Sequence, residues 1–207
     1  IDDKTVAKLG WPIHRSYYQK IIEKLKLQGV QIIAMNLLMD SRNAEKVDQA
    51  LIASIRSAAN VVMPVFYDYS NGNILRQLPE LEHALQGIGD VAVFPGVVTR
   101  HIEVQVSEFF PMGLEVARLY LNIPSPEVTK SDFSLRLGKY MQSPLEAKHL
   151  WRIPYQGPPN FFPSIPFENF FNASHLPDLK GKIVFIGRFD PAFGGQIENF
   201  KLKINCG

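Results

Sequence analysis

The polar residues with the clearest chemical potential follow a short apolar run near the end of the chain. The run Ile183–Ile186 stands between Gly181 and Gly187, and Arg188 and Asp190 come shortly after it. Four consecutive apolar residues, most of them β-branched or aromatic, predict a strand buried on both faces in a parallel sheet. Because open α/β sheets bind ligands at the carboxyl ends of their strands, Arg188 is the first candidate for a binding residue.

The predicted ligand-binding residues are Asp3, Asn36, Asp68, Arg188 and Asp190. The first three follow other predicted parallel strands, so we expect them to approach the same edge of the sheet as Arg188. A guanidinium there suits an anionic or carbonyl-bearing ligand, because its planar donors fix the ligand's orientation. One alternative stays open, in which Arg188 only neutralises Asp190 or Asp3 as a surface ion pair.

The sequence offers little support for catalysis or for a bound metal. Its five histidines are scattered, and no pair has the spacing of metal ligands on a helix. No serine elbow and no glycine-rich nucleotide loop occurs. Cys206 is the only cysteine and lies too near the end to be a convincing nucleophile. The carboxylates of Asp2, Asp3 and Asp190 can hold a cation or cap loops, and we favour capping. We therefore predict neither an enzyme nor a cofactor.

Hydrophobic periodicity predicts alternating strands and helices in the first part of the chain. Ser16–Gln28 and Asn43–Ala59 show helical stripes, and the apolar runs Val30–Ala34 and Val61–Phe66 follow them as strands. Pro64 cannot donate a ladder hydrogen bond, so its strand is expected to be bulged or near an edge. This alternation is typical of a right-handed parallel α/β unit.

The remaining segments complete an α/β fold with a mostly parallel sheet and helices on its faces. Ile1–Thr5 is expected to be the end of a buried strand, and Met112–Leu121 to be a helix. The runs Val91–Phe94 and Val97–Val106 flank Pro95-Gly96 and predict an antiparallel hairpin extension. Phe167–Asn172 is expected to be a short helix whose phenylalanines pack under the sheet, with a ligand-stacking box as the alternative.

Composition limits the class of protein further. The chain has 207 residues, of which 46% are hydrophobic and 20% charged, which is enough apolar content for a substantial core. The net charge is +2, with acidic and basic residues well mixed. Since no basic run or stripe occurs, a nucleic-acid partner is not predicted.

Three stretches, in the same order along the chain, resemble one family. The opening IDDKTVAKLGWPIHRSYYQKIIEKLKLQGVQIIAMNLLM contains an Asp-Asp-Lys-Thr loop, a Trp-Pro pair and an arginine before a helix. The middle stretch is GDVAVFPGVVTR, and the closing stretches are IPYQGPPNFFPSIPFENFF and LPDLKGKIVFIGRFDPAFGG. Together they resemble the second type of CHASE domain, the extracellular sensory module of bacterial receptor kinases and nucleotide cyclases.

The resemblance implies a function that the residues alone do not specify. It implies that residues 1–207 are one extracytoplasmic sensory domain, cut from a longer receptor that is anchored in the membrane. It also implies signalling to a cytoplasmic kinase, cyclase or phosphodiesterase, usually through homodimers. The ligand, a small molecule or a protein, stays unknown. Many family members have aspartate where this chain has Asn36, and a small residue where it has Arg188. The alternative function is a structural module that mediates dimer assembly without a small ligand.

Overall fold

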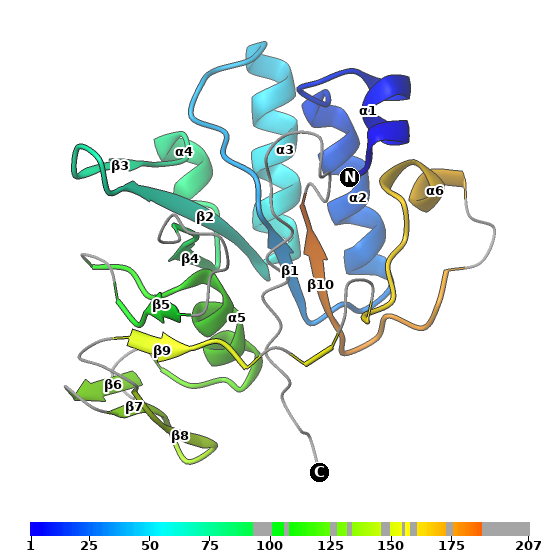
Figure 1. The fold of residues 1–207 in the computed structure, drawn as a ribbon. Coiled ribbons are helices and arrows are strands. Elements are labelled where there is room, and N and C mark those ends of the chain that lie inside the picture. Colours follow the sequence, from blue (N-terminus) through cyan, green and yellow to red (C-terminus); the bar gives the residue numbers. More distant parts are fainter. Residues whose placement is uncertain are drawn as a thin grey trace.

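The centre of the fold is a parallel sheet, as predicted. The computed structural model describes residues 1–92, 101–105, 108–124, 128–131, 134–145, 150–154, 156–157, 161–172 and 176–187. Its parallel strands are β10 (Ile183–Ile186), β1 (Ile32–Met35), β2 (Val61–Asp68) and β4 (Gly87–Asp90), in that spatial order (Figure 1). A short strand, β3 (Asn73–Leu75), pairs antiparallel with the end of β2. The α/β fold class is therefore confirmed.

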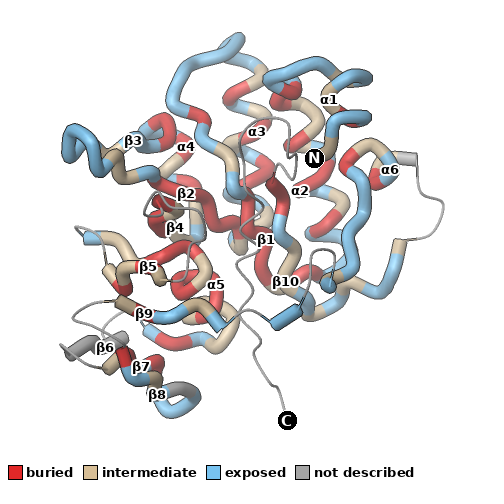
Figure 2. Tube along the Cα trace, viewed as in Figure 1, coloured by how far each residue is buried: buried red, intermediate tan, exposed pale blue. Residues whose placement is uncertain are grey.

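Helices cover both faces of the sheet because the strand residues alternate between two apolar layers. On one face, α2 (Arg15–Leu27) and α3 (Glu45–Ala58) pack side by side over Ile33 and Met35 of β1. On the other face, α5 (Met112–Tyr120) packs over Ile32 and Ala34 of the same strand. The central strands are consequently buried, whereas the β2–β3 turn is exposed (Figure 2).

A second, smaller core lies against the other side of α5. It contains β5 (His101–Glu103) paired with β9 (Leu150–Arg152), and a three-stranded sheet of β6 (Val128–Ser131), β7 (Ser134–Leu137) and β8 (Met141–Pro144). Leu114 and Ala117 of α5 pack in this core together with Ile102 and Trp151. The helix therefore belongs to both cores, since Met112 and Val116 face the main sheet.

Three short helices complete the described structure. They are α1 (Asp3–Leu9), α4 (Pro79–Glu82) and α6 (Phe167–Asn172). Phe167 and Phe170 of α6 are buried in the main core, which confirms that these aromatic residues pack under the sheet. The Phe167 ring packs edge to face against Tyr18, and the Phe170 ring against Phe171, an arrangement that adds to the stabilisation from burial.

Several predictions about local structure are wrong. Ile1–Thr5 does not end a strand, because α1 begins at Asp3 and the carboxylate of Asp2 accepts a hydrogen bond from Thr5 N at 2.9 Å. An N-cap aspartate turns the chain into a helix by satisfying a free N–H group. β10 is not buried on both faces, since Phe185 is 46% exposed. The expectation for β2 holds in part: it pairs with β1 and with β4, so it is not itself an edge strand, but β4 beside it ends the parallel order.

One described antiparallel pair in the region of the predicted hairpin has a partner that the sequence did not indicate. β5 falls inside the predicted run Val97–Val106, but it pairs with β9, some fifty residues further along the chain. Residues 93–100, which would form most of the predicted hairpin, lie outside the described residues. Pairing between distant segments depends on tertiary packing, which local alternation of side chains does not specify.

Candidate functional site

The carboxyl ends of β1 and β10 meet the start of α1 at one edge of the sheet. The backbone nitrogen of Ile1 donates to the Gly187 carbonyl at 2.7 Å. The Asn36 N–H donates to the Ile186 carbonyl at 2.7 Å. We call residues 1–3, 36 and 186–187 the strand-end rim. Two hydrogen bonds between residues far apart in the sequence therefore fix this rim.

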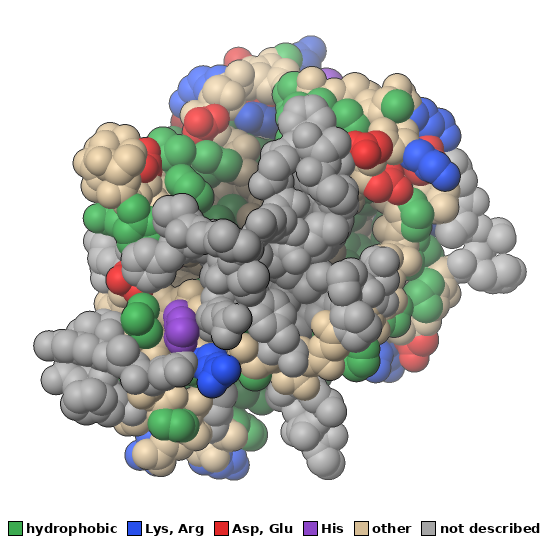
Figure 3. Space-filling view, in the orientation of Figure 1, with side chains coloured by type: hydrophobic (Ala, Val, Ile, Leu, Met, Phe, Trp, Pro, Cys, Tyr) green, Lys and Arg blue, Asp and Glu red, His purple; other side chains and the backbone are tan. Residues whose placement is uncertain are grey.

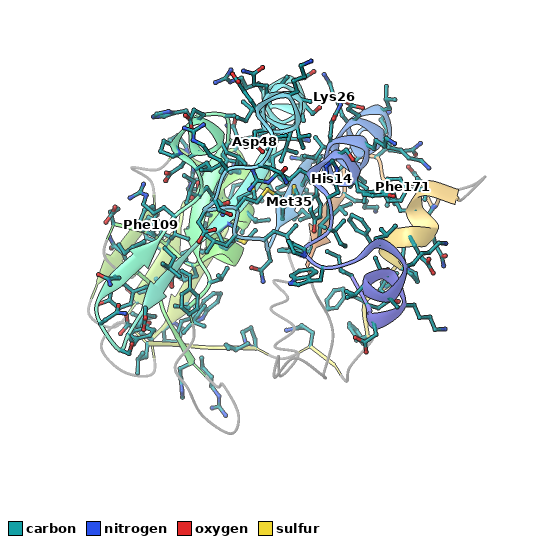
Figure 4. All side chains as sticks on the ribbon, turned by 90° about the horizontal axis from the view of Figure 1, so that it is seen from above. His14, Lys26, Met35, Asp48, Phe109 and Phe171 are labelled. Atoms are coloured by element: carbon teal, nitrogen blue, oxygen red, sulfur yellow. The ribbon has the colours of Figure 1, made fainter. Side chains whose placement is uncertain are left out.

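The rim contains two of the predicted site residues. Asp3 is the first residue of α1, Asn36 follows β1 directly, and both are exposed. Arg188 and Asp190 lie outside the described residues, but Arg188 is the residue after Gly187. A view from above places Met35, at the end of β1, near the middle of the molecule, with Phe171 of α6 on one side and Phe109 on the other (Figure 4).

Asp68 has a different environment from the other predicted site residues. It ends β2 at the β2–β3 turn, which projects from the sheet on the side away from β10 (Figure 1). Its carboxylate accepts hydrogen bonds from Ser70 Oγ at 2.6 Å, from Ser70 N at 2.9 Å and from Asn71 Nδ2 at 2.7 Å. The Ser70 hydroxyl and N–H groups hold the pKa of Asp68 below its usual value. Asp68 therefore stabilises the turn.

A buried glutamine explains how β1 and β2 separate toward the rim. The two strands pair only at Val61 and Val62 of β2, and Pro64 lies beyond the end of that pairing. Gln77 Nε2 donates to the Pro64 carbonyl at 2.7 Å and to the Leu37 carbonyl at 3.1 Å. Gln77 Oε1 accepts from Met39 N at 2.8 Å. The side-chain amide of Gln77 thus makes hydrogen bonds at the place where the strand ladder is interrupted, because Pro64 has no backbone N–H to donate. Sequence analysis missed Gln77, and the mid-strand proline was the only signal for it.

A buried ion pair fixes the loop that follows Asn36. Arg15 Nη1 contacts the Asp48 carboxylate, and Arg15 Nη2 donates to the Ser41 carbonyl. The other oxygen of Asp48 accepts from Asn43 N at 2.9 Å. Arg15 begins α2 and Asp48 lies in the first turn of α3, so the pair joins both helices to the loop. Because charged groups are costly to bury, the loop depends on this pair staying intact.

Asp90 is another polar residue at the carboxyl end of a parallel strand, and sequence analysis missed it as well. It is the last residue of β4 and only 5% exposed. Its carboxylate accepts hydrogen bonds from Tyr67 N at 3.0 Å and from Ala92 N at 3.2 Å. Burial raises the pKa of Asp90, and the nearby carboxylate of Glu103 adds to that effect. The signal in the sequence for this buried carboxylate was the Gly-Asp pair that opens the stretch GDVAVFPGVVTR.

The described part of the strand-end rim presents the carboxylate of Asp3 and the amide of Asn36, both on exposed residues. These are groups that can exchange hydrogen bonds with a polar ligand. Among the described residues, no three His, Cys, Asp or Glu side chains gather closely enough to bind a metal ion. Asp2 caps α1, as favoured from the sequence.

Comparison with known proteins defines the family. A sequence model of the CHASE2 domain matches residues 1–197, nearly the whole chain. The protein therefore belongs to the CHASE2 family, whose members are extracellular sensory domains of membrane receptors rather than catalytic domains. The search of curated proteins gave no match, and neither did the search of solved structures. Within the described residues, no helix is both long enough and apolar enough to cross a membrane.

Proposed function

We propose that this domain is the extracytoplasmic sensor of a bacterial transmembrane receptor and binds its ligand at the strand-end rim. Membership of the CHASE2 family carries the proposal. The geometry supports it, since hydrogen bonds join Asn36 and the start of α1 to the end of β10. Rims of this kind, at the carboxyl ends of parallel strands, are where open α/β sheets bind ligands.

The ligand is proposed to be anionic or to carry a carbonyl group. Arg188 would supply planar guanidinium donors, and its position after Gly187 puts it next to the rim in sequence. Asn36, Asp3 and Asp190 would add hydrogen-bonding groups around it. We leave Asp68 out of this set, because its oxygens already accept hydrogen bonds within the β2–β3 turn.

The output of the proposed receptor is a cytoplasmic kinase, cyclase or phosphodiesterase. The domain would be held to the membrane by flanking segments and would act as a homodimer. Ligand binding would shift the population of two receptor states, which requires a difference in affinity between those states. Support for this scheme comes from the sensory role of the family.

A metabolite screen by thermal shift tests the ligand proposal. At a concentration of 100 times its dissociation constant, a ligand stabilises the fold by about 2.7 kcal/mol. For a domain of this size the melting temperature should rise by about 5 to 11 °C. Arg188→Ala and Asn36→Ala are expected to lose most of that shift. Gln28→Ala is the matched control, because Gln28 is exposed and follows α2, before β1 begins. A hit that shifts all four proteins equally would place the site elsewhere.

A dimerisation module without a small ligand is the second candidate, and one observation favours it. Phe66 and Leu75 lie opposite each other on β2 and β3 and are 41% and 45% exposed. Figure 3 shows hydrophobic side chains gathered over this hairpin. Exposed apolar pairs on a projecting hairpin are typical of protein contact surfaces.

Sedimentation equilibrium tests the dimerisation candidate. Phe66→Ser combined with Leu75→Ser is expected to weaken a dimer at least tenfold, since two large apolar side chains would leave the interface. Leu27→Ser is the control, because Leu27 is exposed at the far end of α2. A wild-type protein that stays monomeric, or a dimer that the double variant leaves unchanged, would argue against this surface.

A further inference from the structure

The amino ends of the strands lie at the end of the sheet opposite the strand-end rim. Three segments meet there: the end of α2, the end of α3 and the turn before β10 (Figure 1). The Gly181 N–H donates to the Gly29 carbonyl at 2.9 Å, and Asn60 Nδ2 donates to the Val30 carbonyl at 2.7 Å. Hydrogen bonds between the segments therefore hold this end of the molecule together. We call residues 26–31, 56–60 and 178–182 the amino-end surface.

The amino-end surface carries a surplus of positive charge. Its exposed cations come from all three segments, and they are Lys26, Arg56, Lys180 and Lys182. The structure describes these three ranges in full, and Asp178 is the one carboxylate within them. The Asp178 carboxylate accepts a hydrogen bond from the Lys180 N–H at 3.0 Å. Four cations against one carboxylate make this end of the sheet suited to an anionic partner.

An apolar side chain projects from the same surface. Leu27 is the last residue of α2 and is 86% exposed. Cations in the last turn of a helix complement its dipole, which accounts for Lys26 and Arg56. The helix dipole does not account for Lys180 and Lys182, which precede a strand, or for the exposed Leu27. The combination of cations around a projecting apolar side chain therefore points to a partner that is both anionic and apolar.

We propose that the amino-end surface rests on an anionic lipid bilayer. Basic residues near such a bilayer are attracted to its surface, and apolar side chains among them enter the boundary between headgroups and acyl chains. Leu27 enters that boundary, while the lysine side chains extend along it and bring their ammonium groups to the lipid phosphates. In this orientation the strand-end rim points away from the bilayer, where a solute reaches it. The proposal rests on the proposed attachment of the domain to a membrane, and it needs no ligand at the rim.

Flotation of the purified domain with lipid vesicles tests this surface. At about 0.1 M salt, the domain is expected to float with vesicles of equal parts phosphatidylglycerol and phosphatidylcholine, and to stay largely unbound with phosphatidylcholine alone. Each basic residue near an anionic bilayer raises the affinity about fivefold. Combining Lys26→Glu, Lys180→Glu and Lys182→Glu should therefore lower the affinity at least about tenfold. Leu27→Ser should lower it by about threefold or more, since the apolar contact is lost.

A second triple variant controls for net charge. Lys4→Glu, Lys20→Glu and Lys46→Glu change the charge by the same amount at exposed positions outside the amino-end surface. Charges more than about 10 Å from the bilayer are screened at this salt concentration, so the control should keep most of its binding. An equal loss in the two triple variants would overturn the proposal. A wild type that fails to float, or that floats equally with both kinds of vesicle, would also overturn it.

Two further arms separate this surface from other sites. Glycerol phosphate at millimolar concentration should leave the vesicle-bound domain in place, because a bilayer presents many headgroups together with an apolar layer. Release by glycerol phosphate would show a pocket for a free phosphate instead and would contradict the proposal. Asn36→Ala should float as the wild type does, so a failure of the ligand site at the rim is distinguishable from a failure of the amino-end surface.

Discussion

Gly89→Ala is expected to lower the free energy of unfolding by about 3 kcal/mol, the upper end of the cost of overpacking a core. A Cβ at Gly89 would lie 2.4 Å from Met112 Cα, 2.7 Å from Met112 N and 3.0 Å from the Phe110 carbonyl oxygen. These are backbone atoms, so they cannot move aside as a side chain can. The added methyl group would push α5 away from β4 and disturb both cores. Chemical denaturation of the two proteins measures the loss.

Gly87→Ala is the matched control on the same strand. A Cβ at Gly87 would meet Glu115 Oε1 at 2.7 Å and Leu119 Cδ1 at 2.8 Å, which are the far ends of two side chains. Because side-chain ends can rotate, we expect a loss of about 1 kcal/mol, clearly smaller than at Gly89. Equal costs at the two glycines would mean that α5 does not approach β4 as closely as described.

Arg15→Met is expected to cost about 3 to 5 kcal/mol, because it leaves Asp48 buried and unpaired. The pair is almost inaccessible to solvent, and Arg15 also donates to the Ser41 carbonyl. Combining Arg15→Met with Asp48→Leu should recover much of the loss, since the double change removes both charges. Recovery should stay incomplete, because the Ser41 carbonyl and the Asn43 N–H lose their partners.

An exposed ion pair provides the comparison for this prediction. Arg42 and Glu80 form a similar contact, but both side chains are largely open to solvent. Surface pairs contribute little to stability, so Arg42→Met should change the free energy of unfolding far less than Arg15→Met does. If Arg15→Met were as mild as Arg42→Met, the loop after β1 would not depend on the buried pair.

Elements with a strong apolar period could be predicted from the sequence. The stripes of α2, α3 and α5 and the apolar runs of β1 and β2 each have one clear periodicity, and the structure agrees with all of them. Burial against a sheet selects such patterns directly, so the sequence preserves them. The packing of Phe167 and Phe170 could be predicted for the same reason.

Elements that depend on distant contacts could not be predicted. β4 has the sequence Gly-Ile-Gly-Asp, a poor strand former, and its glycines are explained only by the approach of α5. The pairing of β5 with β9 depends on residues far along the chain. The prediction for β10 assumed cover on both sides, yet Phe185 is largely exposed.

In the candidate site, too, residues that follow a strongly periodic element could be predicted, and residues whose role depends on distant contacts could not. Asn36 could be placed near the end of β10 from the parallel strand order, because it follows β1 directly. Asp3 was expected to follow a strand, but it begins α1, and the hydrogen bond from Ile1 to Gly187 is what brings this segment to β10. Asp68 ends β2, but the chain then turns back into β3, so Asp68 lies in a turn away from β10 and not at the rim. Asp90 was missed because its role depends on contacts with Tyr67 and Ala92 that only the fold brings together.

The most direct test of the sensor proposal is to locate the bound ligand by amide chemical shifts. A compound found in the thermal-shift screen would be titrated into isotopically labelled protein. The proposal predicts the largest shifts at the strand-end rim, at Asn36 and Gly187, with the amides of Asn71 and Asn73 in the β2–β3 turn unchanged. Largest shifts in that turn, with the rim unchanged, would contradict it.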